Sequence, residues 1–144
     1  MMSVRRLTRF FFLVLAAAVA AGSAGAAELK VLAVDAMKPA LQQLKPAMEK
    51  AGEEKVAIEY ATSAAIEKKI DAEDEYDIVI VDKAILTKLA KAAKVAGGLL
   101  VPLAKDYEAS ETNWTMHALD AQAVIEFLAG PQAKEVYKSK GLTG

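Results

Sequence analysis

The segment from residue 56 to residue 83 constrains the fold more than any other part of the chain, because it has the pattern of a complete strand–helix–strand unit. Residues 56–60 alternate between apolar and polar types, as a half-buried strand does. Residues 64–72 follow with helical spacing, and residues 78–81 form a β-branched run typical of a strand buried on both faces of a parallel sheet. Two parallel strands joined by a helix form a right-handed crossover, so the segment predicts an α/β domain.

The loop between the first strand and the helix of this unit is the first candidate ligand site. Loops at the carboxyl ends of parallel strands, followed by a helix N-terminus, are where α/β folds bind ligands, and anions in particular. Thr62 and Ser63 occupy this loop. Serine and threonine also cap helices without any ligand, so capping alone and capping combined with ligand contact both stay open.

Residues 1–26 have the pattern of a secretory signal peptide. Three arginines precede an apolar stretch over residues 10–21 and a run of small residues, so cleavage is expected after Ala26 or Ala27. No later segment approaches the ~20 apolar residues that a membrane-spanning helix needs. An export signal on a chain without cysteine indicates a bacterial periplasm.

The composition after this segment excludes several classes of function. All arginines lie in the segment, so the remainder carries 15 lysines against 19 acidic residues. This negative balance argues against nucleic acid or an anionic membrane as a partner. A chain with no cysteine and with His117 as its one histidine is poorly suited to zinc, and His117 is expected to be structural. Because no nucleophile stands with a base, we expect neither an enzyme nor a cofactor.

The N-terminal part of the mature chain supplies one more strand and two more helices. Residues 29–34 predict a strand, followed by a helix to about Lys50 with Asp35 as its N-cap. Pro46 lies inside this helix and should kink it or divide it. Asp82 is predicted to cap the helix that follows the buried strand of the central unit.

The C-terminal part predicts an edge strand near Pro102, a polar loop over 105–113 and a strand over 114–119. A helix capped by Asp120 and a last helix over 132–139 complete the chain. The whole pattern predicts a single three-layer α/β domain, with a mainly parallel sheet of about five strands and helices on both faces. The expected order of the first three strands is 2-1-3, with the strand over 114–119 beside the third.

Four stretches of the sequence resemble a known family. "LKVLAVDAMKPALQQLKPAMEKA", "ATSAAIEKKI" and "YDIVIVDKAILTKLAKAAKVAGG" are similar to the first lobe of the periplasmic substrate-binding proteins of ABC importers, above all the molybdate- or oxyanion-binding branch. The ending "TNWTMHALDAQAVIEFLAGPQAKEVYKSKGL" resembles their C-terminal stretch, which returns to the first lobe. The resemblance implies a domain over 27–144 like one lobe of a type II periplasmic binding protein. Residues 27–98 would be its N-terminal portion and 107–144 its C-terminal portion, with no counterpart of the second lobe.

The resemblance also implies a site for a small anion, such as molybdate or tungstate, in the loops after the first two strands. In this family neutral hydroxyls and backbone N–H groups hold the oxyanion. One departure is that Asp35 stands in the loop where these binders usually place a serine. The residues expected to form the site are Ala36, Met37, Thr62, Ser63 and Ala64.

A chain with one lobe is expected to bind its ligand weakly or in an altered way, because half of the usual contacts are missing. An ABC permease is the partner that the resemblance implies. Two alternatives stay open: a protein-interaction or sensory module on the same lobe, and a degenerate remnant that binds nothing. The mature chain is expected to be a monomer or a weak homodimer.

Overall fold

The computed structural model describes residues 28–97 and 99–142, which form one α/β domain around a five-stranded mixed sheet. The strand order is β2-β1-β3-β5-β4, so the predicted order of the first three strands is confirmed. β1 pairs in parallel with β2 and β3, whereas β5 runs antiparallel to both β3 and β4. The strands are β1 (Glu28–Val34), β2 (Lys55–Ala61), β3 (Ile78–Asp82), β4 (Val101–Ala104) and β5 (Tyr107–Glu111).

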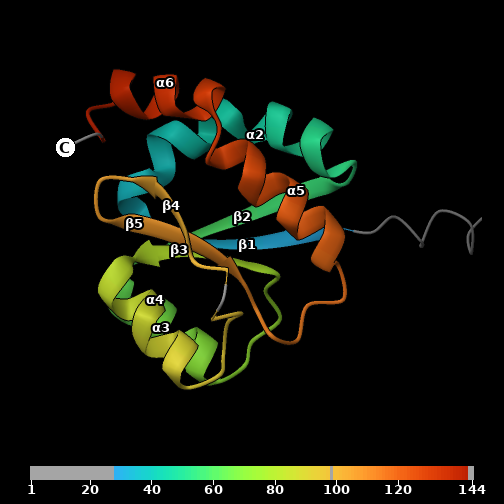
Figure 1. The fold of residues 1–144 in the computed structure, drawn as a ribbon, viewed down its shortest axis with the longest axis vertical. Coiled ribbons are helices and arrows are strands. Elements are labelled where there is room, and N and C mark those ends of the chain that lie inside the picture. Colours follow the sequence, from blue (N-terminus) through green and yellow to red (C-terminus); the bar gives the residue numbers. More distant parts are fainter. Residues whose placement is uncertain (1–27, 98, 143–144) are drawn as a thin grey trace, which may run out of the picture.

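Helices cover both faces of the sheet, which gives the three layers that the sequence predicts (Figure 1). One face carries α2 (Lys38–Gly52), α5 (Ala118–Leu128) and α6 (Pro131–Ser139), with the short 3-10 turn η1 (Asp35–Met37) before α2. The other face carries α3 (Ser63–Asp71) and α4 (Lys83–Lys91). None of the helices in the described residues is long and apolar enough to cross a membrane.

The centre of the core is β3, which lies between the two helical layers. All four residues from Ile78 to Val81 are fully buried, as the β-branched run predicts. β1 contributes Leu29, Val31, Leu32 and Ala33, which are also fully buried. These two strands fix the position of every loop at the ends of the parallel part of the sheet.

The two predictions for residues 105–119 are wrong. Residues 107–111, expected in a polar loop, form β5 in the interior of the sheet, and residues 114–119, expected as a strand, form a turn and the start of α5. The sequence pattern did not indicate this strand, because three of its residues are polar although they are buried: Glu108, Ser110 and Glu111. The buried Ser110 hydroxyl donates to the Ala96 carbonyl at 3.2 Å, and β3 and β4 supply backbone partners on both sides.

The predictions for helix caps and for Pro46 also need correction. Asp35 lies inside η1, and the N-cap residue of α2 is Met37. Asp120 lies in the first turn of α5, whose N-cap residue is His117. α2 runs continuously across Pro46, because its apolar face stays packed in the core and tertiary packing offsets the missing hydrogen bond.

A tight hairpin lies in the segment where the second lobe of the family has no counterpart in this sequence. β4 and β5 are joined by a two-residue turn, Lys105 and Asp106. The carbonyl of Asp106 accepts a hydrogen bond from the backbone N–H of Lys83 at 2.8 Å, which fixes the turn to the start of α4. Within the described residues the chain thus turns directly from one edge strand back into the sheet.

Candidate functional site

The carboxyl ends of β1 and β2 bring the predicted site residues together. These two strands are parallel neighbours in the register Val34 to Ala61, so the segments that follow them start side by side. The turn η1 follows β1 and provides Ala36 and Met37, and the start of α3 follows β2. Two helical segments therefore begin at adjacent points of one sheet edge, where unpaired backbone N–H groups favour an anion.

Thr62 is the N-cap residue of α3. Its hydroxyl oxygen accepts a hydrogen bond from the backbone N–H of Ala65 at 3.2 Å, which is the capping role that the sequence suggests. The side chain is exposed at this edge of the sheet. A hydroxyl that accepts a hydrogen bond can still donate one, so Thr62 can cap α3 and contact an anion at the same time.

Ser63 is tied to a carboxylate. Its hydroxyl donates to Asp82 Oδ2 at 2.5 Å, across the ends of β2 and β3. Asp82 stands at the N-cap position of α4, and within the described chain its side chain makes no capping bond to that helix. The predicted capping role of Asp82 is thus replaced by the bond to Ser63, and the Ser63 hydroxyl is engaged with a negative group.

The loop after β1 offers backbone rather than side-chain contacts. Ala36 is exposed, whereas the Met37 side chain is fully buried in the core. Lys38 places its ammonium group 5.5 Å from the centre of the Tyr60 ring, at the start of α2 and the end of β2. This cation therefore stands at the end of β2, next to the predicted anion loops.

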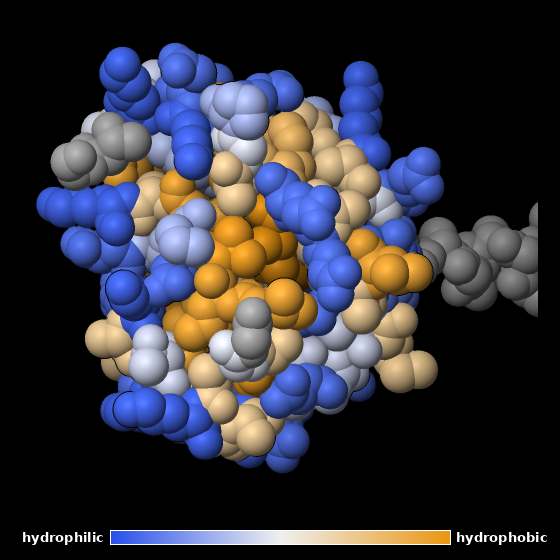
Figure 2. Space-filling model, viewed as in Figure 1, coloured by the Kyte–Doolittle hydropathy of each residue, from blue (hydrophilic) through white to orange (hydrophobic). Residues whose placement is uncertain are grey.

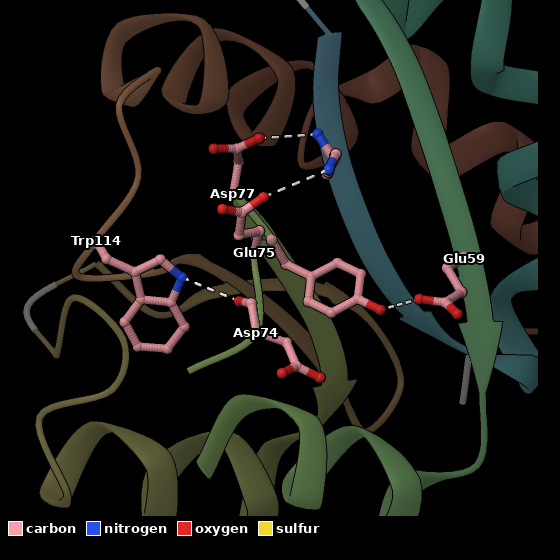
Figure 3. A network of polar contacts seen from close by, with 7 residues as sticks. Glu59, Asp74, Glu75, Asp77 and Trp114 are labelled. Carbon is pink, nitrogen blue, oxygen red and sulfur yellow. Dashed lines mark hydrogen bonds and ion pairs between the residues drawn. The ribbon is translucent and has the colours of Figure 1, made fainter. Parts of the chain in front are cut away.

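A polar network lies at the opposite, amino end of the parallel strands (Figure 3). Asp77 is 9% exposed, and its carboxylate accepts hydrogen bonds from the Lys30 backbone N–H at 2.8 Å and from the Thr115 hydroxyl at 2.7 Å. The Trp114 indole N–H donates to the Asp74 carbonyl at 3.1 Å. These bonds hold the turn before α5 against β1 and β3.

Glu54, His117 and Asp120 form a cluster that sequence reasoning misses. Their ligand-type atoms all lie within 4.8 Å of one another, and His117 Nδ1 lies 3.3 Å from Glu54 Oε1. Burial raises the pKa of Glu54, the neighbouring Asp120 carboxyl raises it further, and His117 partly opposes the rise. The only sign of this cluster in the sequence is the spacing of His117 and Asp120, which are three residues apart. Glu54 comes from a distant element, so its approach could not be read from the sequence.

An apolar surface occupies the middle of the face drawn in Figure 2, over β4 and toward α5. A hollow of about 130 Å³ in this region is lined by Leu99, Val101 and Ile125 together with Glu111, Gln122 and Glu126. Leu99 is 46% exposed. The surface is separate from the carboxyl edge of β1 and β2.

Two solved structures have a similar fold. A substrate-binding domain from Clostridium difficile, assigned to a molybdenum ABC transporter, superposes with a TM-score of 0.73 at 10% identity, covering 79% of this chain and 97% of that chain. The periplasmic molybdate-binding protein of Azotobacter vinelandii gives a TM-score of 0.70 at 12% identity, covering 81% of this chain and 99% of that chain. At such identities the likeness shows the fold.

The sequence itself identifies the family. No curated protein sequence matches the chain significantly. The family model of bacterial extracellular solute-binding proteins matches residues 29–107, which is more than half of the chain and spans β1 through the start of β5. The chain therefore belongs to the family of bacterial extracellular solute-binding proteins.

Proposed function

We propose that the chain is a single-lobe, periplasmic solute-binding module that binds a small oxyanion, such as molybdate or tungstate, at the carboxyl edge of β1 and β2. The observation that carries the proposal is the meeting of two helical N-termini at this edge, with the exposed Thr62 hydroxyl beside them, in a member of a solute-binding family. The family consists of solute-binding proteins rather than enzymes, and both structural relatives are named for molybdenum or molybdate.

The ligand would be held by neutral groups. Ser63 and Ala64 offer backbone N–H groups at the start of α3, Ala36 and Met37 offer them after β1, and Thr62 offers its hydroxyl. A neutral hydrogen bond contributes about 0.5–1.5 kcal/mol net, and one to a charged group up to ~3 kcal/mol. With one side of the anion left in water, we expect a Kd on the order of 0.1–1 mM.

The experiment that tests the proposal is a thermal-shift screen of the chain against molybdate, tungstate, sulfate, phosphate and small organic acids, followed by calorimetric titration of each anion that raises Tm. Weak saturable binding of a tetrahedral oxyanion supports the proposal. Nanomolar binding would mean that another chain supplies a second wall. If none of these anions binds, the proposal fails, and a protein-interaction module acting through the apolar surface over β4 and α5 becomes the better account.

Export is part of the same proposal. The signal-peptide pattern lies in residues 1–26, outside the described residues. Mass spectrometry of the periplasmic fraction of a bacterial host is expected to find a mature chain that begins at Ala27 or Glu28. The expected partner of this mature chain is a permease in the cell envelope. A full-length product confined to the cytoplasm would overturn this part of the proposal.

Substitution of Thr62 by valine is expected to weaken anion binding about tenfold or more. It keeps the shape of the side chain but removes both the hydrogen bond to the charged ligand and the cap on the Ala65 N–H. Calorimetric titration with molybdate or tungstate measures the loss. Thr62→Ser retains the hydroxyl and is expected to bind within about twofold of the parent chain.

Ser63→Ala and Asp82→Asn test the neighbouring pair. Removing the Ser63 hydroxyl leaves the Asp82 carboxylate unscreened at the edge, so affinity should fall several-fold, whereas neutralising Asp82 should raise affinity by a similar factor at low salt. Ser139→Ala, on α6, is the control and should leave affinity unchanged. Equal affinity in all of these variants, Thr62→Val included, would place the ligand elsewhere.

A further inference from the structure

The cluster of Glu54, His117 and Asp120 lies away from the proposed anion site. Glu54 stands between the end of α2 and the start of β2, and His117 and Asp120 belong to the beginning of α5. The Glu54 side chain is 15% exposed and the His117 side chain 30% exposed. One imidazole nitrogen and two carboxylate groups therefore converge at the amino end of the sheet, in a place that solvent reaches only in part.

The backbone at the end of α2 lies in close contact with α5. Gly52 packs against α5 so tightly that a Cβ atom there would lie 2.8 Å from Val124 Cγ2 and 3.4 Å from the Asp120 carbonyl oxygen. Glu53 then ends α2 in the left-handed conformation, with φ of 54°, and turns the chain so that Glu54 reaches α5. The junction of α2 and β2 is thereby brought against the first turn of α5.

The main chain at His117 is held by hydrogen bonds that do not involve its ring. The backbone N–H of His117 donates to the Thr115 hydroxyl oxygen at 3.0 Å, and that hydroxyl donates to Asp77 Oδ1. Asp77 is in turn bonded to the Lys30 backbone N–H. This chain of hydrogen bonds fixes the main chain at His117, while the Nδ1 atom faces Glu54.

One carboxylate oxygen of the cluster is buried without a partner in the described part of the chain. Glu54 Oε2 is sealed from solvent and has no hydrogen-bond partner among the described residues. Glu54 and Asp120 place two carboxyl groups side by side, and burial together with Asp120 raises the pKa of Glu54. A buried carboxylate oxygen that lacks a partner is costly, and a bound cation would satisfy it.

The sequence alone made zinc an unsuitable ligand, because it could not show that Glu54 lies beside His117. On the geometry we propose that Glu54, His117 and Asp120 form a binding site for a divalent transition-metal ion, with Zn²⁺ preferred over Mn²⁺. Imidazole nitrogen and carboxylate oxygen are ordinary ligands of Zn²⁺, and three protein ligands leave a further position for water. The order of affinities for such ligands rises from Mn²⁺ to Zn²⁺. Mg²⁺ and Ca²⁺ prefer oxygen ligands alone, and Ca²⁺ needs more of them than this cluster offers.

A metal ion at this place would join the α2–β2 junction to the start of α5. It would therefore act on the stability of the lobe, and it would not touch the anion bound at the other end of the sheet. The proposal goes beyond the proposed function, and either can fail while the other stands.

The test uses the complete chain, produced without an affinity tag and stripped of metal with a chelator. His117 is the only histidine, so every imidazole signal in a nitrogen-15 correlation spectrum reports on this one site. Addition of one equivalent of Zn²⁺ is expected to shift the His117 signals and fix one tautomer, with Nδ1 as the metal ligand. Calorimetry is expected to give one Zn²⁺ per chain, with Mg²⁺ and Ca²⁺ at least tenfold weaker.

Glu54→Gln, His117→Asn and Asp120→Asn are each expected to weaken Zn²⁺ binding about tenfold or more. Glu126→Gln, an exposed position on the same helix, is the matched control and should bind as the parent chain does. If Zn²⁺ leaves the His117 signals unmoved, or if all three variants bind as tightly as the control, the cluster is an ion pair of histidine with two carboxyl groups and the proposal is overturned. The measurement on the parent chain decides this even where a variant fails to fold.

Discussion

Replacement of Tyr137 by alanine is expected to lower the free energy of unfolding by about 3–5 kcal/mol, a large part of the total for a domain of this size. Tyr137 is fully buried on α6, and its hydroxyl donates to the Leu128 carbonyl at the end of α5 at 2.7 Å. Burial raises the pKa of Tyr137, as expected for a phenol enclosed by apolar groups. Truncation would leave a cavity where α6 packs on α2 and α5. Urea unfolding at neutral pH measures the loss.

Two further variants separate the parts of this effect. Tyr137→Phe keeps the ring and removes only the hydrogen bond, so a loss of about 1–2 kcal/mol is expected. Lys138→Ala changes the adjacent exposed residue and should stay within about 0.5 kcal/mol of the parent. A loss below ~1 kcal/mol for Tyr137→Ala would show that α6 is not docked in the way described.

Replacement of Asp77 by alanine is expected to cost about 3 kcal/mol, because it removes a nearly buried carboxylate that accepts two hydrogen bonds. The donors are the Lys30 backbone N–H and the Thr115 hydroxyl, and a hydrogen bond to a charged group contributes about 1.5–3 kcal/mol. The Lys30 N–H (Figure 3) and the Thr115 hydroxyl would both lose this acceptor at the amino end of β1. Urea unfolding and amide hydrogen exchange at Lys30 measure the change.

The control for Asp77 is the exposed Asp74, whose replacement by alanine should change stability by no more than about 0.5 kcal/mol. Thr115→Val removes one of the two donors, and a double-mutant cycle with Asp77→Ala is expected to give a coupling energy of about 1 kcal/mol or more. Strictly additive losses would mean that the Asp77–Thr115 contact does not contribute to the fold.

The sequence was sufficient to predict those helices and strands whose burial shows in their own pattern of apolar and polar residues. The alternation in β2, the apolar run of β3 and the spacing of Ile66 and Ile70 in α3 each report burial through local periodicity. Together with β1 they limit the possible strand orders, because parallel strands joined by helices have few allowed arrangements, and 2-1-3 is among these. The three layers follow from the same pattern.

β5 could not be predicted in this way, because its burial is decided by its neighbours. Glu108 and Ser110 read as polar loop residues, yet β3 and β4 pair with their backbones on both sides. Residues 114–119 have the opposite problem, since their alternation suggested a strand while the Trp114 indole N–H binds the Asp74 carbonyl in a turn. Tertiary context overrides local propensity in both cases.

The candidate anion site was only partly accessible to sequence reasoning. The sequence placed Thr62 and Ser63 after a strand parallel to β1, and the register of β1 with β2 brings the segments that follow the two strands side by side. The bond between Ser63 and Asp82 depends on how the ends of β2 and β3 approach across β1, which no local pattern encodes. The approach of Glu54 to His117 depends on the packing of α2 on α5, for which Gly52 gave no recognisable sign.

The most direct test of the central claim, a one-sided oxyanion site at the carboxyl edge of β1 and β2, is a titration of the isotope-labelled chain with molybdate, followed by the backbone amide signals. We predict saturable shifts that are largest at Ala36–Met37 and at Ser63–Ala65, with a Kd on the order of 0.1–1 mM. Shifts centred on another surface, or no saturable shift at several millimolar molybdate, would contradict the claim.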